Sequence, residues 1–543
     1  MRTFHILLLF SSLSSIFLLG NCAKIQSPKG GPKDVLPPKL DTALSSPFAK
    51  TNFSPRELVF YFDEYVEVKN AYKEVFISPS VVYNPQIISR GKKVKLKLDK
   101  REVLKENATY NINFGNSIVD FHEGNILKNF TYFFSTGDKI DSLEITGKVV
   151  NALTNEPEKN FIIGLYRIGS DTIISTEKPI YLARLTEEGK FQFRYIAAGD
   201  YSLVAINDKN LNFKYDKPSE EIAFAETDVN LPDSTTFFTL TSSFPNQEPK
   251  IISKQINTFG KATFIFNQIP DTLLVDSNLG SPLFSEKAKD SVHIYYSTEL
   301  DSFKIFVHQD TFNIRPKNKE AFLKKHKLEI SKVKQSDLLV TDTFKILMNA
   351  PFTVIDSNKI KLKDSLRWIS EFDYNVSGRT LQVVYPWKSG RNYSLKIDSA
   401  AIRDIYGSTN DTLKAQCVIL APKDLCQYEL TVKDLDEKSH YTIHVLKRDG
   451  SNFATATVQN DSTYTFHFKG IRPDQYDVEI FEDRNLNNKW DPGDYFLKRQ
   501  PETYKRFKGE KLRADKDSEK IISWKEAPNI DTKTNTQKIN FSK

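Results

Sequence analysis

The feature that most constrains the fold of this chain is a long internal repeat. Residues 191–216 recur at residues 466–491, without a gap and at a constant offset of 275 positions. A repeat of this kind encodes one supersecondary unit twice, so the chain holds two copies of one structural unit far apart in sequence. Ten of the 26 positions are identical, and in the first copy they are Phe191, Phe193, Ile196, Tyr201, Asp208, Asn210, Leu211, Asn212, Lys214 and Asp216.

A fainter repeat precedes each of these copies. Residues 110–124 read Tyr-Asn-Ile-Asn-Phe, then Ile-Val-Asp-Phe, and end at a glycine. Residues 393–407 follow the same order as Tyr-Ser-Leu-Lys-Ile, then Ile-Arg-Asp-Ile and a glycine, with a spacing that differs by one residue. Together the two repeats predict a two-domain unit used twice, with a further β region around 250–316 between the copies.

Short alternating runs between turn residues predict strands that bury one face. Apolar and polar residues alternate in 94–98, 110–114, 303–307 and 464–468, which is the period that a half-buried strand requires. Aromatic residues make up 12% of the chain and Met only two residues, a balance that favours strands. One short helix is expected at 317–325. The predicted fold is all-β, with tandem β-sandwich domains of Ig-like and transthyretin or carboxypeptidase-regulatory-like type, arranged as beads on a string.

Length and composition also divide the chain into parts, because 543 residues exceed what one hydrophobic core holds. The predicted parts are a signal peptide (1–21), a tether rich in Pro, Gly and Lys (22–45), an Ig-like domain (46–138), a β-sandwich with an Asp/Asn loop (139–240), a middle β domain (241–325), a second, divergent Ig-like domain (326–421), a second β-sandwich with an Asp/Asn loop (422–528) and a flexible tail (529–543).

The N-terminal segment predicts where the protein is located. Arg2 precedes a largely apolar run, 6–19. Gly20, Asn21 and a single cysteine, Cys22, follow this run. This resembles a bacterial lipoprotein signal, which implies that Cys22 is acylated, with palmitate among the acyl chains, and becomes the new N-terminus. The alternative is an ordinary secretory signal that is cleaved elsewhere. No later apolar run reaches the roughly 20 residues that span a bilayer.

Residues 54–70, SPRELVFYFDEYVEVKN, and residues 110–125, YNINFGNSIVDFHEGN, resemble the S-layer-type bacterial Ig-like domain. That domain has a Phe-x-Phe strand near its start and an Ile-x-Asp-x-x-Gly-Asn turn near its end. Tether and domain together are similar to envelope lipoproteins of Bacteroidota-type bacteria. The resemblance implies a lipid-anchored, extracytoplasmic β protein of the outer membrane, on its periplasmic or its surface face, and it implies no reaction.

The two copies of the Asp/Asn loop are candidate calcium sites. Oxygen-bearing side chains recur at the spacing with which a winding loop surrounds a hard cation, with a backbone carbonyl from the lysine position. The alternative is a tight loop whose Asp and Asn side chains hydrogen-bond their own backbone. The proposed ligands are Asp483, Asn485, Asn487, Lys489, Asp491 and Asp494 in the second copy, and Asp208, Asn210, Asn212, Lys214 and Asp216 in the first, weaker copy.

The remaining cysteines, Cys417 and Cys426, lie nine positions apart. An extracytoplasmic compartment permits a disulfide between them, and two buried free thiols are the alternative.

No catalytic constellation is present in the sequence. The His-Glu-x-x-His, Gly-x-Ser-x-Gly, phosphate-loop and Cys-x-x-Cys motifs do not occur. The formal charge of +7 is spread along the chain, which argues against a nucleic-acid binder. No cofactor is required, and calcium would be structural.

The sequence therefore predicts a non-enzymatic, outer-membrane-anchored lipoprotein that binds or scaffolds other envelope proteins in an assembly, secretion or uptake machine. Two alternatives stay open: a surface adhesin or glycan-binding protein, and an enzyme of unfamiliar design. For glycan binding the candidate stacking residues are Trp368, Trp387, Trp490 and Trp524.

Overall fold

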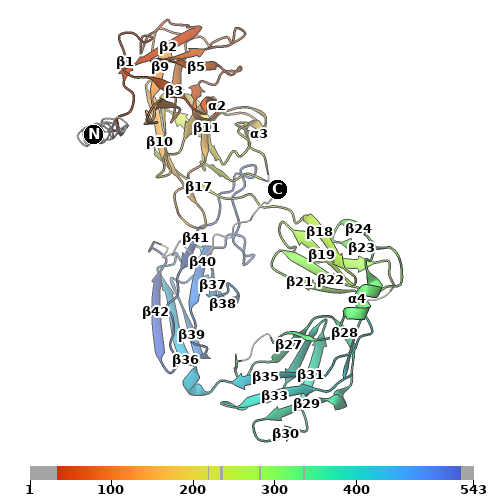
Figure 1. Cartoon of the computed structure of the whole chain (residues 1–543). Coiled ribbons are helices and arrows are strands. Elements are labelled where there is room, and N and C mark those ends of the chain that lie inside the picture. Colours follow the sequence, from red (N-terminus) through yellow and green to blue (C-terminus); the bar gives the residue numbers. More distant parts are fainter. Residues whose placement is uncertain (1–32, 218, 233–236, 281–282, 334–336, 528–543) are drawn as a thin grey trace, which may run out of the picture.

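The chain is almost entirely β in its described part, so the predicted class of tandem β-sandwiches is confirmed. Figure 1 shows five β units, which we call the first to fifth sandwich in chain order. The signal 1–21, the lipid site Cys22 and the tail 529–543 lie outside the described residues. The computed structural model describes residues 33–217, 219–232, 237–280, 283–333 and 337–527.

The first sandwich has strands β1 (Leu40–Asp41), β2 (Glu57–Phe62), β3 (Val66–Val68), β4 (Phe76–Ser78), β5 (Gln86–Arg90), β6 (Lys93–Lys97), β7 (Thr109–Asn113), β8 (Ile118–Asp120) and β9 (Thr131–Ser135), and the short helix α2 (Ala71–Glu74). One sheet has the order β1-β2-β6-β5 and the other β4-β7-β9, and β3 pairs with β8. Phe60 and Tyr132 are fully buried between the sheets, with ring centroids 5.1 Å apart. Each such side chain stabilises the fold by about 1.5–3 kcal/mol.

The fourth sandwich has strands β25 (Ile330–Val333), β26 (Asp337–Leu338), β27 (Phe344–Met348), β28 (Phe352–Ile355), β29 (Ile360–Asp364), β30 (Trp368–Ile369), β31 (Asp373–Ser377), β32 (Thr380–Val384), β33 (Asn392–Ile397), β34 (Ile402–Asp404) and β35 (Leu413–Ile419), with the 3₁₀ turn η2 (Ser357–Lys359). Its sheets, β25-β27-β32-β31 and β26-β35-β33-β29-β30, and its β28-β34 pair repeat the strand order of the first sandwich, with β26 and β30 added at the edges of the second sheet. The faint sequence repeat therefore corresponds to one shared topology.

The second sandwich has strands β10 (Leu143–Asn151), β11 (Ile162–Arg167), β12 (Tyr181–Arg184), β13 (Lys190–Ile196), β14 (Gly199–Ile206), β15 (Ile222–Phe224), β16 (Val229–Leu231) and β17 (Phe237–Ser242), and the helix α3 (Ile173–Thr176). One sheet has the order β13-β10-β17, in which β17 runs parallel to β10. The other has the order β12-β11-β14-β15, and β16 also pairs with β14.

The fifth sandwich has strands β36 (Cys426–Lys433), β37 (His440–Lys447), β38 (Asn452–Gln459), β39 (Thr463–Ile471), β40 (Tyr476–Glu482), β41 (Tyr504–Phe507) and β42 (Asp517–Ser523), preceded by the 3₁₀ turn η3 (Pro422–Asp424). Its sheets have the orders β39-β36-β42 and β38-β37-β40-β41, and β42 is parallel to β36. This is the plan of the second sandwich, so the strong sequence repeat covers two sandwiches of one topology.

The third sandwich has strands β18 (Ile251–Thr258), β19 (Lys261–Phe266), β20 (Val275–Ser277), β21 (Phe284–Lys287), β22 (Ser291–Tyr295), β23 (Phe303–Val307) and β24 (Asp310–Ile314), followed by the helix α4 (Lys319–Lys325). The sheets are β18-β19-β22-β21 and β20-β23-β24. Helix α4 lies within the range predicted for a short helix.

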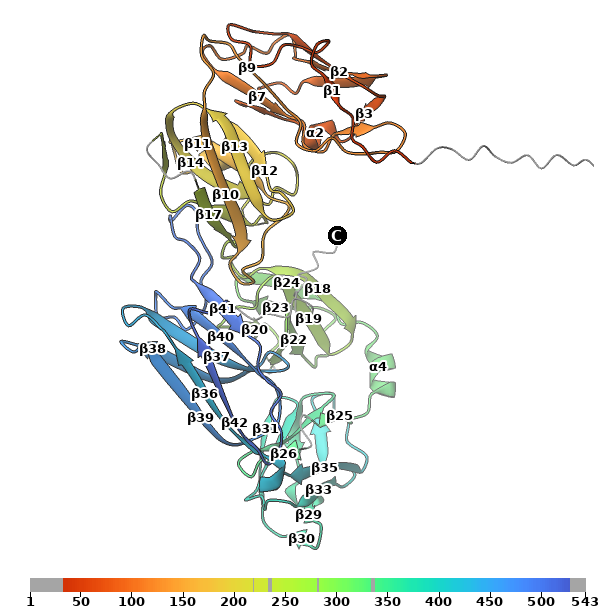
Figure 2. The same ribbon diagram turned by 90° about the vertical axis from the view of Figure 1, so that its left-hand side faces the viewer.

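The five sandwiches do not form an open string throughout. The chain runs from the second sandwich through the third and fourth, and the fifth returns to lie beside the second (Figures 1 and 2). Contacts confirm this closure: the Gly493 amide donates to Ser243 Oγ at 2.9 Å, and Gln500 Nε2 donates to the carbonyl of Phe224 at 3.0 Å. The description as beads on a string leaves out this contact between distant parts of the chain.

Candidate functional site

The Asp/Asn loop of the fifth sandwich is held by hydrogen bonds among its own groups. The buried Asp483 carboxylate accepts from the backbone amides of Asn487 and Asn488, at 3.0 and 2.8 Å, and from Thr442 Oγ1 at 3.0 Å. Positive φ angles at Leu486 (60°) and Asn488 (58°) wind the chain around this carboxylate.

The amide groups of the same loop converge on Asp491. Asn485 Nδ2 and Asn487 Nδ2 donate to Asp491 Oδ2 at 2.6 and 2.9 Å. The Asn487 side-chain oxygen accepts from the Lys489 amide at 2.7 Å. Asp494, the last proposed ligand, lies apart from this network and forms an ion pair with Lys217 of the second sandwich at 3.4 Å.

The first copy of the loop has the same network in the second sandwich. The buried Asp208 carboxylate accepts from the amides of Asn212 and Phe213, at 3.2 and 2.8 Å. Asn210 Nδ2 and Asn212 Nδ2 donate to Asp216 Oδ2, at 2.5 and 2.8 Å. The proposed carbonyl position, Lys214, sends its Nζ to the Thr176 carbonyl at 2.6 Å. The repeat therefore conserves a specific pattern of hydrogen bonds along with the strand order.

A buried glutamate completes each loop, and neither glutamate is among the predicted loop ligands. Glu220 accepts from the amides of Lys209 and Asp216, at 3.0 and 2.9 Å. Glu502 accepts from the amides of Arg484 and Asp491, at 2.8 and 2.9 Å. Burial raises the pKa of both carboxyl groups, and the hydrogen bonds from the amides offset this rise only in part. Both pKa values therefore lie above the ordinary value.

The gap-free repeat does not include the two glutamates, because their separation from it differs between the copies. Glu220 lies four residues after Asp216, whereas Glu502 lies eleven residues after Asp491. The chain between Asp491 and Glu502 is seven residues longer, and a gap-free comparison ends before either glutamate. An alignment that permits one gap and asks for an acidic residue ahead of the next strand is the signal that finds them.

The hydrogen bonds bear directly on the calcium prediction. The Asp483 carboxylate has donors within the protein on both oxygens, so it needs no cation to offset its burial. The amide nitrogens of Asn485 and Asn487 face Asp491, and their oxygens accept backbone amides. The geometry matches the alternative of a self-bonded Asx loop. Calcium binding stays a prediction.

Both cysteines in the described part of the chain are free. Cys417 lies on β35 and Cys426 begins β36, and both side chains are buried. Burial raises the pKa of the Cys417 thiol to about 12 and raises that of Cys426 as well. The disulfide is not formed in this structure, which has the alternative of two buried thiols; each is enclosed in the core of a different sandwich.

The turns that follow β8 in the first sandwich and β34 in the fourth are each built around one buried aspartate. Asp120 accepts from the amides of His122 and Glu123, both at 2.9 Å, and Asp404 accepts from Tyr406 and Ser408, also at 2.9 Å. Burial raises the pKa of Asp120, but the hydrogen bonds from these two amides, a hydrogen bond with the Glu123 side chain and the charge of His122 together outweigh it, and the pKa lies below its ordinary value.

These turns also gather potential ligand atoms. Ligand atoms of Asp120, His122 and Glu123 lie within 4.8 Å of one another. In the fourth sandwich, His326 Nε2 lies 2.6 Å from Asp404 Oδ2. Because the aspartates already accept backbone amides, we interpret both groups as parts of the turn.

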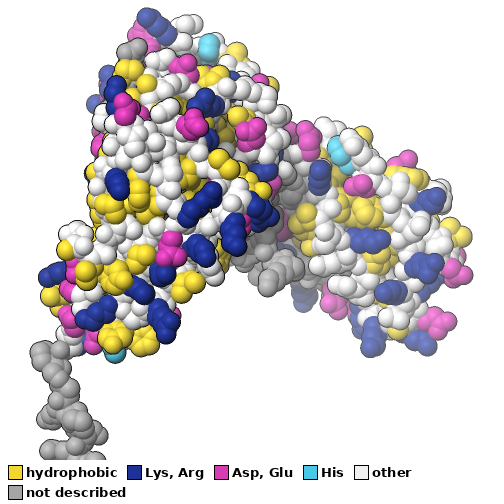
Figure 3. Space-filling model, turned by 90° about the horizontal axis from the view of Figure 1, so that it is seen from above, with side chains coloured by type: hydrophobic (Ala, Val, Ile, Leu, Met, Phe, Trp, Pro, Cys, Tyr) yellow, Lys and Arg dark blue, Asp and Glu magenta, His cyan; other side chains and the backbone are white. Residues whose placement is uncertain are grey.

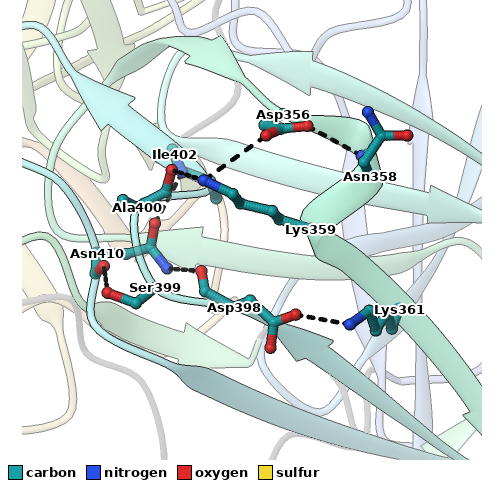
Figure 4. Close-up of polar contacts among 9 residues, drawn as sticks. All are labelled: Asp356, Asn358, Lys359, Lys361, Asp398, Ser399, Ala400, Ile402 and Asn410. Carbon is teal, nitrogen blue, oxygen red and sulfur yellow. Dashed lines mark hydrogen bonds and ion pairs between the residues drawn. The ribbon is translucent and has the colours of Figure 1, made fainter.

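The fourth sandwich also fixes its β33–β34 connection with a buried amide, as Figure 4 shows. Asn410 is 1% exposed; its oxygen accepts from the Ile402 amide at 2.7 Å, and its nitrogen donates to the Asp398 carbonyl at 2.9 Å. On the surface of the same connection, Lys361 pairs with Asp398 at 2.9 Å. These polar groups stabilise a loop and leave no unpaired group at Asn410.

A groove of about 750 Å³ lies where the first two sandwiches meet. The first sandwich contributes α2 and the β4–β5 connection, and the second contributes the tip of its Asp/Asn loop. The Tyr72 ring is 73% exposed at this site. Principal lining residues are Asn70, Tyr72, Asn84, Ile87, Leu211 and Phe213.

Contacts between the sandwiches form the floor and one wall of the groove. The Ser80 amide donates to the Ile180 carbonyl at 2.8 Å, and the rings of Phe76 and Phe213 meet at 5.9 Å. Lys178 Nζ lies 5.6 Å from the centre of the Phe213 ring. The groove is therefore apolar with amide groups at its rim and one cation beside it.

The tryptophans proposed for glycan stacking do not gather in one place. Trp387 is buried and donates to the Asp342 carbonyl at 2.7 Å, and Trp490 donates to the Glu502 carbonyl at 2.8 Å. Trp524 packs on Tyr441 with ring centroids 5.2 Å apart. Trp368, which is 55% exposed, is the tryptophan of the four with the largest free surface.

Charges of both signs are mixed over the molecular face in Figure 3, with hydrophobic side chains among them. This pattern agrees with the even spread of charge along the sequence. Among the described residues, no helix has the length and apolar character needed to cross a bilayer.

Comparison with known families now identifies one part of the chain. Residues 34–136 match the family model of a bacterial Ig-like domain. This segment is the first sandwich, so the Ig-like part of the predicted resemblance is confirmed. The match covers less than a fifth of the chain, and no curated protein matches the sequence significantly.

Solved structures with low similarity include three bacterial proteins. The gamma-CGTase of an alkalophilic Bacillus clarkii is 9% identical over 49% of this chain and 39% of its own length, with a TM-score of 0.16. The major pilin subunit BcpA of Bacillus cereus is 10% identical over 70% and 98%, with a TM-score of 0.14. SGBP-B of a mixed-linkage glucan utilization locus of Bacteroides ovatus is 11% identical over 62% and 89%, with a TM-score of 0.17. At these TM-scores the similarities carry no argument about this chain.

Proposed function

We propose that this chain is a non-enzymatic binding or scaffolding lipoprotein of the cell envelope, held at the outer membrane by acyl chains on Cys22. Its partners are other envelope proteins of an assembly, secretion or uptake machine. The observation that carries the proposal is the groove between the first two sandwiches, which is open, apolar and rimmed by amides. A concave, mostly apolar site with a few polar groups is the default candidate for a binding site.

The position of the groove in the chain supports the same function. It lies in the two sandwiches that follow the tether, so the groove is held near the anchored end of the protein. The Asp/Asn loop that walls it has its buried carboxylate bonded to backbone amides. Those polar groups shape a surface and are not arranged for proton transfer or nucleophilic attack.

Two observations favour glycan binding as a second candidate function. The Tyr72 ring is 73% exposed at the groove, and the exposed Asn70 and Asn84 stand at its rim. An aromatic face stacks on a sugar ring, and side-chain amides hydrogen-bond hydroxyl groups. Binding on a glycan array that is abolished by Tyr72→Ala would support this candidate, and an array without binding would oppose it.

The test of the main proposal is mild-detergent purification of the tagged full-length protein from its native envelope. Wild type is compared with Tyr72→Ala/Asn84→Ala and with Leu366→Ala, a control residue that is 75% exposed on the fourth sandwich. We expect one partner protein to co-elute in stoichiometric amount with wild type and with the control. The amount of this partner should fall by about tenfold or more with the groove variant. Recovery of the lipoprotein alone would contradict the proposal.

A further inference from the structure

The fifth sandwich contains a segment that its own loop does not need. Glu220 and Glu502 bond their loops in the same way, yet the chain between Asp491 and Glu502 is seven residues longer than its counterpart. We call residues 492–500 the strap. Because the shorter connection completes the same network, the extra residues serve something other than the loop.

The strap packs against the second sandwich through Tyr495 and Phe496. Tyr495 is 4% exposed, and its ring meets that of Phe224 edge to face at 5.4 Å. Phe496 packs beside Tyr215, with ring centroids 6.2 Å apart. The apolar cluster that receives Tyr495 consists of Tyr166, Ile174, Val204, Ile206, Tyr215, Ile222 and Phe224.

The receiving surface is the outer face of the sheet that contains β14. Leu203 and Ala205 point into the core of the second sandwich, whereas Val204 and Ile206 belong to the cluster under the strap. At the position that matches Val204, strand β40 of the fifth sandwich has Glu479. An outer strand face is polar where water covers it, so the two copies differ where one of them is covered by the strap.

Polar contacts fix the strap in one orientation. The Gly493 amide donates to Ser243 Oγ at 2.9 Å, and Asp494 pairs with Lys217 at 3.4 Å. A side chain at position 493 would place its Cβ 3.0 Å from Pro501 Cδ and 3.3 Å from Ser243 Oγ. A side chain at this position would therefore force its neighbours to shift by a few tenths of an ångström.

The same Asp/Asn loop meets both the strap and the groove. Tyr215, which is 2% exposed, lies under the strap, and its amide donates to the Ile174 carbonyl at 2.8 Å. Two residues earlier, Phe213 lines the groove and packs against Phe76 of the first sandwich. The hydrogen bonds of Asp208 with the amides of Asn212 and Phe213, and of Asn212 Nδ2 with Asp216, join the two contacts within one loop.

We propose that the strap positions the groove wall, so that docking of the fifth sandwich on the second is coupled to binding in the groove. This inference rests on the proposed function, since it assigns a regulation to the same site. Tyr495 and Phe496 are positioning residues that act through Tyr215 and the loop at 208–217. Release of the strap frees the loop. A ligand that orders the loop therefore favours the state in which the fifth sandwich is docked on the second.

Hydrogen exchange by mass spectrometry on the full chain tests the coupling. We expect Tyr495→Ala/Phe496→Ala to speed exchange at 209–213 by about tenfold or more and to raise the radius of gyration in small-angle scattering. The control, Leu497→Ala, changes a strap residue that is 69% exposed and should leave both unchanged. Gly493→Ala, a milder change, should act in the same direction if the double variant folds poorly.

Two results would overturn the coupling. In the first, the radius of gyration of the strap variant rises while exchange at 209–213 is unchanged. In the second, the strap variant changes neither the radius of gyration nor the exchange. The groove-dependent partner gives a separate readout, because its co-elution should fall with the strap variant and persist with Leu497→Ala. Loss of the partner from wild type as well would remove the proposed function, and the exchange data would still decide whether strap and loop are coupled.

Discussion

At the scale of single residues, buried carboxylates in the described part of the chain accept hydrogen bonds from backbone amides. Asp208 and Asp483 each bond two amides of the loop that follows, and Glu220 and Glu502 each tie the start of that loop to its end. An amide left buried without an acceptor costs about 1–3 kcal/mol. These four groups therefore define the loops, although the sequence repeat includes just two of them.

We expect Glu502→Ala to destabilise the fifth sandwich by at least about 1–3 kcal/mol, because the amides of Arg484 and Asp491 lose their acceptor. Chemical denaturation followed by tryptophan fluorescence measures the change. The matched control is Glu519→Ala, which removes an exposed glutamate on β42. Equal effects of the two variants would show that the Glu502 carboxylate does not hold the loop.

The pH dependence of this group has a definite sign. Burial raises the pKa of Glu502 in the folded state, so the folded chain binds more protons than the unfolded chain between the ordinary pKa and the raised one. Its contribution to the free energy of unfolding therefore falls as pH rises through that window. We expect the free energy of unfolding of wild type minus that of Glu502→Gln to decrease from pH 4 to pH 7. An increase of this quantity over the same range would contradict the account.

The calcium prediction is tested at the same scale. A chain whose loops hold calcium melts at a higher temperature in millimolar calcium than in chelator, by ligand linkage. Asp491→Asn should remove that shift, since Asp491 is the acceptor on which Asn485 and Asn487 converge. An unchanged melting temperature would establish the loops as self-bonded and dispose of the ion.

At the scale of elements, parallel edge strands complete both repeated sandwiches. β42 pairs with residues 427–433 of β36 and adds Ile522, 1% exposed, to the core. We expect truncation after residue 516 to expose the edge of β36 and to cause aggregation, whereas truncation after residue 527 should preserve a soluble chain with one cooperative transition for this sandwich. Size-exclusion chromatography with circular dichroism measures both, and a soluble, folded 1–516 chain would contradict the assignment.

The elements were the part of the structure most accessible from sequence. The alternation at 303–307 predicted β23 residue for residue, and the repeat at offset 275 predicted two sandwiches of one topology. Local periodicity suffices there because it reflects burial of one face. The strap was not predicted, because its contact with Phe224 joins residues more than 250 positions apart. The one local sign was the continuous apolar run 203–206, because the second copy has Glu479 at the position of Val204.

The site was less predictable for the same reason. The proposed calcium residues were brought together except for Asp494, which belongs to the strap. The groove combines α2 of one sandwich with a loop of the next, and no residue pattern along the chain marks such a junction.

At the scale of the whole molecule, four sandwiches close into a ring and the first extends from it (Figure 1). The groove lies where the first two sandwiches meet. Mixed surface charge and an apolar groove fit a protein that holds a partner by shape.

We expect Cys22→Ser to move the protein from the membrane fraction to the soluble fraction, and its retention in the membrane would contradict lipid anchoring.

The central claim, that the groove holds an envelope partner, is tested most directly by photo-crosslinking in native cells. A photoreactive residue is placed at Asn84, on the groove rim, or at Leu366, exposed on the fourth sandwich. The account predicts one discrete adduct from position 84 that position 366 does not give. No adduct at position 84, or the same adducts from both positions, would contradict it.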